Sequence, residues 1–185
     1  MDGSLRRAKQ PVSAMLTGPY GHPFHPMLVT LPIGAWICSL VFDIAAQFVE
    51  PVGLLARGSE WLIAIGVIGA LGAASVGSLD LMGIQTGTRA FRTGLLHMSS
   101  MLTVTAAYVL NFLWRLGSAT DGGSVPIGPL VLSIISVVAL AAGGTLGGRL
   151  AYRFGVRVAD EGTQAEGFVS VRRSAAEVSD EERSR

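Results

Sequence analysis

The sequence predicts an all-α integral membrane protein, a bundle of four transmembrane helices with the N- and C-termini in the cytoplasm. Half of its 185 residues are hydrophobic, only 15% are charged, and the mean hydropathy is +0.51. Ionisable side chains are absent from residues 62–79 and from residues 126–148. Because about 20 apolar residues suffice to cross the hydrocarbon core as a helix, both stretches are transmembrane candidates.

Four hydrophobic segments follow one another along the chain. They cover residues 26–48, 59–83, 91–116 and 126–150 approximately. The linkers between them are short and rich in Gly, Pro and Ser, so neighbouring helices should run antiparallel. We therefore expect a cytoplasmic N-terminal segment over residues 1–20, a four-helix transmembrane domain over residues 21–158 and a disordered cytoplasmic tail over residues 159–185.

Basic residues predict the orientation, because they gather on the cytoplasmic side of membrane proteins. The opposite side offers only Arg57 and Arg115 near the membrane. The proposed cytoplasmic side has basic residues before span one, between spans two and three, and after span four: Arg6, Arg7, Lys9, Arg89, Arg92, Arg149, Arg153 and Arg157. The sequence thus predicts a multi-pass membrane protein with both termini in the cytoplasm.

The first span opens on GHPFHP, residues 21–26, which holds two of the three histidines in the chain. Each histidine precedes a proline, which disfavours the α conformation of the histidine. Pro26 suits a first helical turn, so we expect His25 to cap the helix and both rings, His22 and His25, to lie outside it. Pro32 should kink the span.

The topology places the third histidine in the same layer. His97 follows the predicted start of span three by about six residues, or roughly 9 Å of helix. Polar groups at membrane depth usually face the bundle interior, and neutral imidazole is the commonest metal ligand. The pattern indicates a cofactor or metal site with His25 and His97 as the preferred ligands and His22 as the alternative to His25. The plainer alternative is that the rings cap a helix and form hydrogen bonds between helices.

Asp80, at the end of span two, falls in this layer too. It could orient a ligating histidine, or it could form an ion pair with Arg89 or Arg149. We favour the ion pair. Asp43 lies towards the outer end of its span and is expected to reach the membrane interface.

Glycines form the remaining pattern in the spans. Small residues four apart let helices pack closely, and the same lack of side chains would leave room for a flat macrocycle. Helix packing is the commoner explanation. The glycines concerned are Gly69 in span two and the pairs Gly143/Gly147 and Gly144/Gly148 in span four.

The opening GHPFHPMLVTLPIGAW resembles the GHPxHPMLVxFPIGxW signature of a family of bacterial four-helix membrane proteins, domain of unknown function 2231. The ending GGTLGGRLAYRFGVRV is similar to the family ending GGxLGGxLVYxHGVGV. The resemblance covers about residues 20–158 and implies four helices in the inner membrane. Some members are joined to Rieske-type iron–sulfur domains, which implies a redox context. Many members have histidines where this chain has Thr30 and Phe154, and an acid is common at the position of Arg149, so a site here has at most three imidazoles.

Two functions remain open at this point. One is a b-type haem or metal protein that exchanges electrons with quinone or a membrane redox partner. The other is a non-catalytic scaffold or accessory subunit of a membrane complex. Whether the protein is an enzyme is left open, since no P-loop, G-x-S-x-G or H-E-x-x-H motif occurs. The single Cys38 excludes an intramolecular disulfide and a zinc ribbon, and no basic patch favours nucleic acid.

Overall fold

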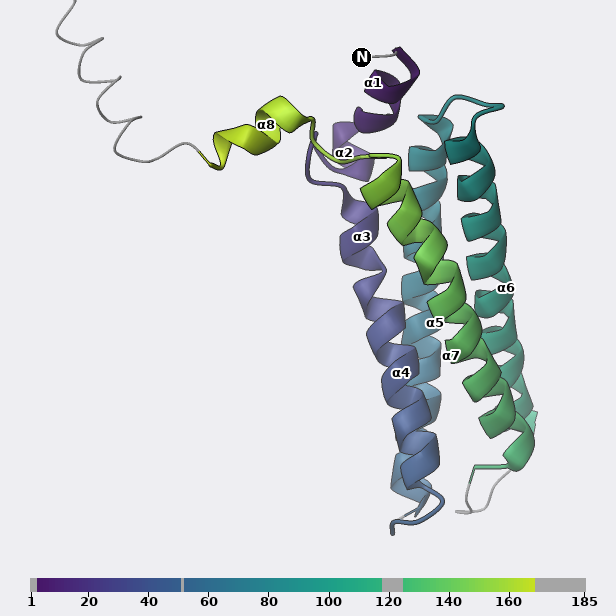
Figure 1. The fold of residues 1–185 in the computed structure, drawn as a ribbon. Helices are drawn as coiled ribbons and strands as arrows, with labels where there is room; N and C mark the ends of the chain where they lie inside the picture. Colours follow the sequence, from purple (N-terminus) through teal and green to yellow (C-terminus); the bar gives the residue numbers. More distant parts are fainter. Residues whose placement is uncertain (1–2, 51, 118–124, 169–185) are drawn as a thin grey trace, which may run out of the picture.

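A computed structural model of the chain describes residues 3–50, 52–117 and 125–168. Within these ranges it contains helices and no strands. Four long helical segments lie side by side as a bundle (Figure 1), and each is long and apolar enough to cross a membrane. The spans are Phe24–Ala45, Gly53–Met82, Arg89–Gly117 and Ile127–Arg153. The predicted all-α bundle of four transmembrane helices is confirmed.

The first span consists of two helices, α3 (Phe24–Leu28) and α4 (Thr30–Ala45), which meet at Val29. Pro32 has no amide hydrogen and cannot bond back to the carbonyl four residues earlier, which explains a break at this point. The expectation that His25 caps the span from outside is wrong. Pro23 is the N-cap and His25 is the second residue of α3, because the first turn leaves amide groups unbonded and so accepts Pro26.

The other spans are α5 (Val52–Met82), α6 (Arg89–Gly117) and α7 (Ile127–Gly148), the last extended by a π-helical turn η1 (Arg149–Arg153). Their outward faces carry large exposed apolar side chains, as a lipid-facing surface requires, since water-soluble proteins rarely expose such continuous apolar area. The buried core contains Trp36, Ile63 and Tyr108, with the rings of Trp36 and Tyr108 stacked at a centroid distance of 4.2 Å. The chain is therefore a multi-pass membrane protein.

Both ends of the described chain lie at the same end of the bundle, called here the terminal end (Figure 1). The N-terminal part forms α1 (Gly3–Lys9) and α2 (Ala14–Thr17), which cover that end. Lys9 Nζ donates to the carbonyls of Val158 and Ala159, at 3.1 and 3.2 Å. Tyr20 donates its hydroxyl hydrogen to the carboxylate of Asp160 at 2.9 Å.

Part of the segment predicted to be a disordered tail is structured. Asp160 caps a short helix, α8 (Glu161–Glu166), by accepting a hydrogen bond from the amide of Thr163. A capped turn tethered through Tyr20 is held in place, which composition alone does not reveal. The rest of the predicted tail, residues 169–185, lies outside the described residues, as does most of the linker between spans three and four.

Candidate functional site

Two histidine rings meet between the spans near the terminal end. His25 comes from α3 and His97 from α6, and their ring centroids are 6.3 Å apart with the planes at 89°. Both side chains are half-buried. The structure thus brings together the two histidines that the sequence analysis preferred, although their role as ligands stays a prediction.

Each ring is fixed by one hydrogen bond to the backbone of another helix. Nδ1 of His25 lies 2.8 Å from the carbonyl oxygen of Ala73, and Nδ1 of His97 lies 3.0 Å from that of Gly143. A carbonyl oxygen can only accept, so Nδ1 carries the hydrogen and donates in both rings. In the neutral rings Nε2 then keeps its lone pair, and among the described residues neither Nε2 has a hydrogen-bond partner.

Glycines allow the two rings to lie against the neighbouring helices. A Cβ added at Gly77 would meet the ring of His25 at 2.8 Å, and one added at Gly147 would meet the ring of His97 at 3.0 Å. These close approaches require the absence of a side chain, because real Cβ contacts are longer.

The other glycines of the predicted packing faces differ in their surroundings. Gly69 faces Leu31 and Pro32 of α4, and Gly143 faces Ser100 and Met101 of α6. Nothing approaches Gly144 within 4 Å, and the nearest atom to Gly148 belongs to Tyr152 at 4.0 Å. Side chains of other spans therefore already occupy the space above Gly69, Gly143 and Gly147, where a macrocycle would have to lie.

His22 does not join this pair. Its side chain is exposed, and its amide donates to the carbonyl of Pro19 at 3.0 Å in a turn before α3. Within residues 3–50, 52–117 and 125–168, no group of three or more His, Cys, Asp or Glu side chains is arranged to hold a metal ion. Of the three histidines predicted to share one layer, only His25 and His97 therefore lie against each other.

Asp80 pairs with neither predicted arginine. Its carboxylate lies 2.9 Å from Nε of Arg157, while Arg89 and Arg149 are exposed. Arg157 has a φ of 60°, and this left-handed residue turns the chain after η1 back over the bundle. The same guanidinium donates to the carbonyls of Thr17 and Gly18, both at 2.8 Å, and so anchors the segment that leads into GHPFHP.

A second polar cluster at the opposite end was missed by the sequence analysis. Asp43 is fully buried and accepts two hydrogen bonds from Arg115, at 2.8 and 2.6 Å, instead of reaching the interface. The guanidinium also donates to Asn111 at 2.8 Å and to Ser59 at 3.2 Å. Because all four spans contribute to this network, including Ser133 of α7, its evident effect is to join the helices. The signal available was that Arg115 and Asn111 are four residues apart, on one face of a helix.

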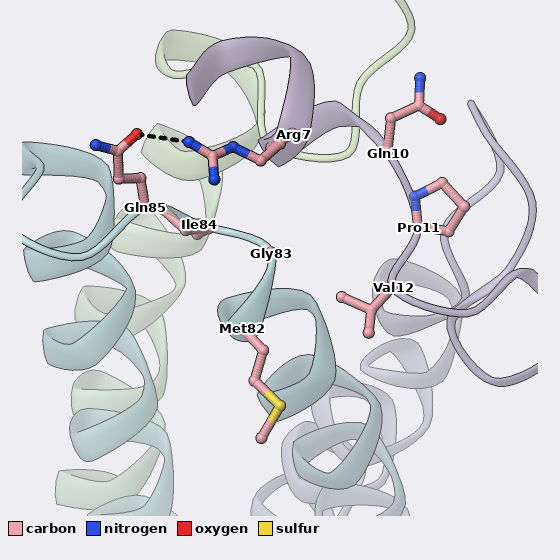
Figure 2. Close-up of a pocket in the computed structure, with 8 residues that line it drawn as sticks. All are labelled: Arg7, Gln10, Pro11, Val12, Met82, Gly83, Ile84 and Gln85. Carbon is pink, nitrogen blue, oxygen red and sulfur yellow. Dashed lines mark hydrogen bonds between the residues drawn. The ribbon is translucent and has the colours of Figure 1, made fainter. Parts of the chain in front are cut away.

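The terminal end also carries an open groove of about 270 Å³ between the N-terminal segment and the end of α5. Figure 2 shows Arg7, Gln10 and Gln85 along one side of this groove and Val12 and Met82 further into the bundle. Arg7 donates to the side-chain oxygen of Gln85 at 3.2 Å. None of the histidines lines the groove, so it is separate from the histidine pair.

A family model described as "Predicted membrane protein (DUF2231)" matches residues 21–160. Comparison with curated proteins and with solved structures gives no match.

Proposed function

Since the chain belongs to the DUF2231 family of predicted membrane proteins, we propose that it is a bacterial inner-membrane protein that binds a transition metal between His25 and His97 and takes part in electron transfer. The observation that carries this proposal is the commitment of both Nδ1 hydrogens to backbone carbonyls. Metal-ligating histidines characteristically donate their other ring N–H to a carbonyl or carboxylate, which fixes the tautomer and aims the free nitrogen.

The distance between the ring centroids, taken by itself, is of the size expected for one ion between two imidazoles. A metal–nitrogen bond of about 2.0–2.1 Å puts the ring centroid about 3 Å from the metal, so two rings on opposite sides lie about 6 Å apart. The centroids of His25 and His97 are 6.3 Å apart. Imidazole nitrogens suit zinc, copper, iron and nickel, and of these copper and iron carry electrons.

Haem b shares this ligand chemistry but fits less well. Two histidines from different helices are suitable axial ligands of a haem iron. However, side chains other than the histidines cover Gly69 and Gly143, two of the glycines expected to accommodate the ring. We therefore propose a metal ion as the ligand of the two histidines. Binding of haem b would be a second possible outcome of the same experiment. The metal would supply one-electron chemistry, with a quinone or a membrane redox protein as the partner.

The proposed location of the pair is the cytoplasmic side. The terminal end of the bundle carries the N-terminal basic residues, the turn before Arg89 and the basic turn η1. Positive residues flanking short loops favour the cytoplasmic side, which supports placing the terminal end there.

The test is the metal and haem content of the purified full-length protein. It is expressed in bacteria supplied with haem and trace metals, extracted in mild detergent, and examined by elemental analysis and by a reduced-minus-oxidised absorption spectrum. We expect a metal in the parent protein and in the control His22→Ala, and its loss in His25→Ala and His97→Ala. A haem spectrum would select haem b, whereas a parent protein without metal or haem would refute the proposal.

The alternative function is a non-catalytic scaffold or accessory subunit. Gly144 favours this alternative. The residue is exposed on α7, and a Cβ added there would meet no neighbouring side chain or helix within 4 Å, so a partner helix could approach closely. If this alternative holds, the purified protein contains no metal and a partner protein copurifies with it in mild detergent. Gly144→Leu then lowers the amount of partner recovered, whereas His97→Ala leaves that amount unchanged.

A further inference from the structure

The contacts of the two histidines are repeated in the two halves of the bundle. His25 bonds to the carbonyl of Ala73 and lies over Gly77, the residue one turn further along α5. His97 bonds to the carbonyl of Gly143 and lies over Gly147, one turn further along α7. The histidine numbers differ by 72, and the numbers of both partners in the second helix differ by 70.

The same offsets recur at the other end of the spans. A Cβ at Gly58 would meet the ring of Phe42 at 2.8 Å, and a Cβ at Gly128 would meet the ring of Trp114 at 2.6 Å. Phe42 and Trp114 again differ by 72, and the two glycines by 70. In each half, therefore, a ring of the first helix lies over a glycine of the second helix in the same register.

Burial follows the same correspondence. Four of the five buried residues of α4 fall on buried residues of α6 when 72 is added to their numbers. The four buried residues of α5 in residues 53–82 all fall on buried residues of α7 when 70 is added. The α4–α6 pairs are Pro32/Val104, Trp36/Tyr108, Ser39/Asn111 and Asp43/Arg115, and the α5–α7 pairs are Ser59/Pro129, Ile63/Ser133, Gly66/Ser136 and Ala73/Gly143.

Three corresponding pairs also touch each other. The rings of His25 and His97 meet edge to face, those of Trp36 and Tyr108 stack with planes at 8°, and Asp43 forms its ion pair with Arg115. A residue meets its own equivalent only where a two-fold axis passes between the two. The first and third spans run in the same direction, because each is followed by an antiparallel neighbour, so such an axis runs along the bundle.

We infer that the transmembrane domain is a tandem duplication of one helical hairpin, residues 24–82 and 96–152, related by a pseudo-two-fold axis on which the histidine pair lies. Parallel repeats about an axis along the membrane normal occur in other membrane proteins. The inference rests on packing register alone, so it holds whether or not the histidines bind a metal.

The three pairs that touch across the axis differ in whether their two members are the same residue type. In a symmetric dimer of hairpins the residues at position 43 would be two acids or two arginines, which is costly at membrane depth. Joining the hairpins in one chain lets the two positions differ, and they form the complementary pair Asp43 and Arg115. Of the three pairs only the histidines are identical, so a ligand small enough to lie on the axis, such as a single ion, would meet the same residue type from both hairpins.

Exchange variants test the equivalence of the two hairpins. The variant Trp36→Tyr/Tyr108→Trp, combined with Gly66→Ser/Ser136→Gly, swaps the stacked rings across the axis. The second exchange is needed because the indole of Trp36 lies over Gly66, whereas the equivalent residue Ser136 carries a side chain. In the parent, Trp36 Nε1 donates to the carbonyl of Ile63 at 3.4 Å, and the equivalent acceptor for an indole at position 108 is the carbonyl of Ser133. A matched control, Trp36→Phe/Phe112→Trp, exchanges the same indole with an aromatic residue that is not its equivalent. Asp43→Arg/Arg115→Asp makes the corresponding exchange of charges.

The measurement is the thermal unfolding of the full chain in mild detergent. We expect the Trp36/Tyr108 exchange to melt within about 4 °C of the parent protein and above either single variant. The control should melt below it, and the charge exchange should accumulate to higher levels than either of its single variants. The duplication is overturned if the ring exchange melts no higher than the control, or if both exchange variants fail to accumulate in the membrane.

Discussion

Removal of the negative charge at Asp43 provides a direct measure of how the bundle is held together. In Asp43→Asn the shape of the side chain is almost unchanged, but Arg115 keeps its charge and is only about 5% exposed. Its remaining hydrogen bonds go to neutral groups, those of Asn111, Ser59 and Ser133. Breaking a buried ion pair by removing one partner costs about 3–5 kcal/mol, because the other charge is left uncompensated.

A loss of that size should lower the melting temperature by roughly 6–20 °C for a chain of this length. The assay is thermal or denaturant unfolding of the full chain in mild detergent, followed by circular dichroism. Glu60→Gln is the matched control, since it removes a half-buried acid of the neighbouring span and should change stability by less than about 0.5 kcal/mol. Asp43→Leu/Arg115→Met, which removes both charges, should recover most of the loss. A cost below about 1 kcal/mol for Asp43→Asn would refute the reasoning, because it would mean that water reaches the guanidinium.

Two further predictions concern the terminal end. Gly77→Ala should destabilise the protein by about 1–3 kcal/mol, because its methyl carbon would lie 2.8 Å from an imidazole ring, whereas Gly72→Ala, with nothing within 4 Å, should be neutral or stabilising in the same unfolding assay. Hydrogen bonds from the Thr163 amide and the Tyr20 hydroxyl hold the pKa of Asp160 below its usual value, so the attachment of α8 should be complete above the usual carboxyl pKa and be lost only as the pH falls through the lowered one. Tyr20→Phe should shift that loss to higher pH, as measured by amide hydrogen exchange of residues 157–168, and an unchanged profile would contradict the assignment.

Hydropathy was sufficient to predict the four spans, because their length and lack of charge are set by the bilayer itself. That His25 and His97 lie in one layer of the bundle also followed from counting residues along each span. The ion-pair partners of the charged residues could not be predicted from hydropathy. Asp80 pairs with Arg157 only because the chain reverses at a left-handed residue after η1, which hydropathy does not encode.

The buried ion pair and the duplication were missed for a related reason. An acid and an arginine near the ends of two spans suggest contact with the interface, unless the rotation of each helix about its axis is known. Once that rotation is known, Asp43 and Arg115 face each other across the centre of the bundle. The two hairpins have buried residues and close contacts at equivalent positions, but few identical residues at those positions. Aligning one hairpin sequence with the other by residue identity therefore does not reveal the repeat. Trp36 and Tyr108, for example, are both buried aromatic residues without being the same residue.

The two polar clusters on the axis differ in whether they leave a side-chain nitrogen free to bind a ligand. Every nitrogen of the Arg115 guanidinium has a hydrogen-bond partner among the described residues, so the cluster at Asp43 has no donor left for a ligand and serves to hold the spans together. At the other end, His25 and His97 each use one nitrogen to fix the ring and keep the other free of protein partners in the described part of the chain. A structural role would be served equally well by two asparagines, which also donate a side-chain N–H to a backbone carbonyl of a neighbouring helix. The amide oxygen of asparagine is a poor ligand for copper or iron, which imidazole nitrogen suits. His97→Asn therefore separates the two roles: it should abolish metal binding, and it should preserve the melting temperature of the metal-free protein to within a few degrees. A metal-free variant that melts far below the metal-free parent would assign the histidine a packing role.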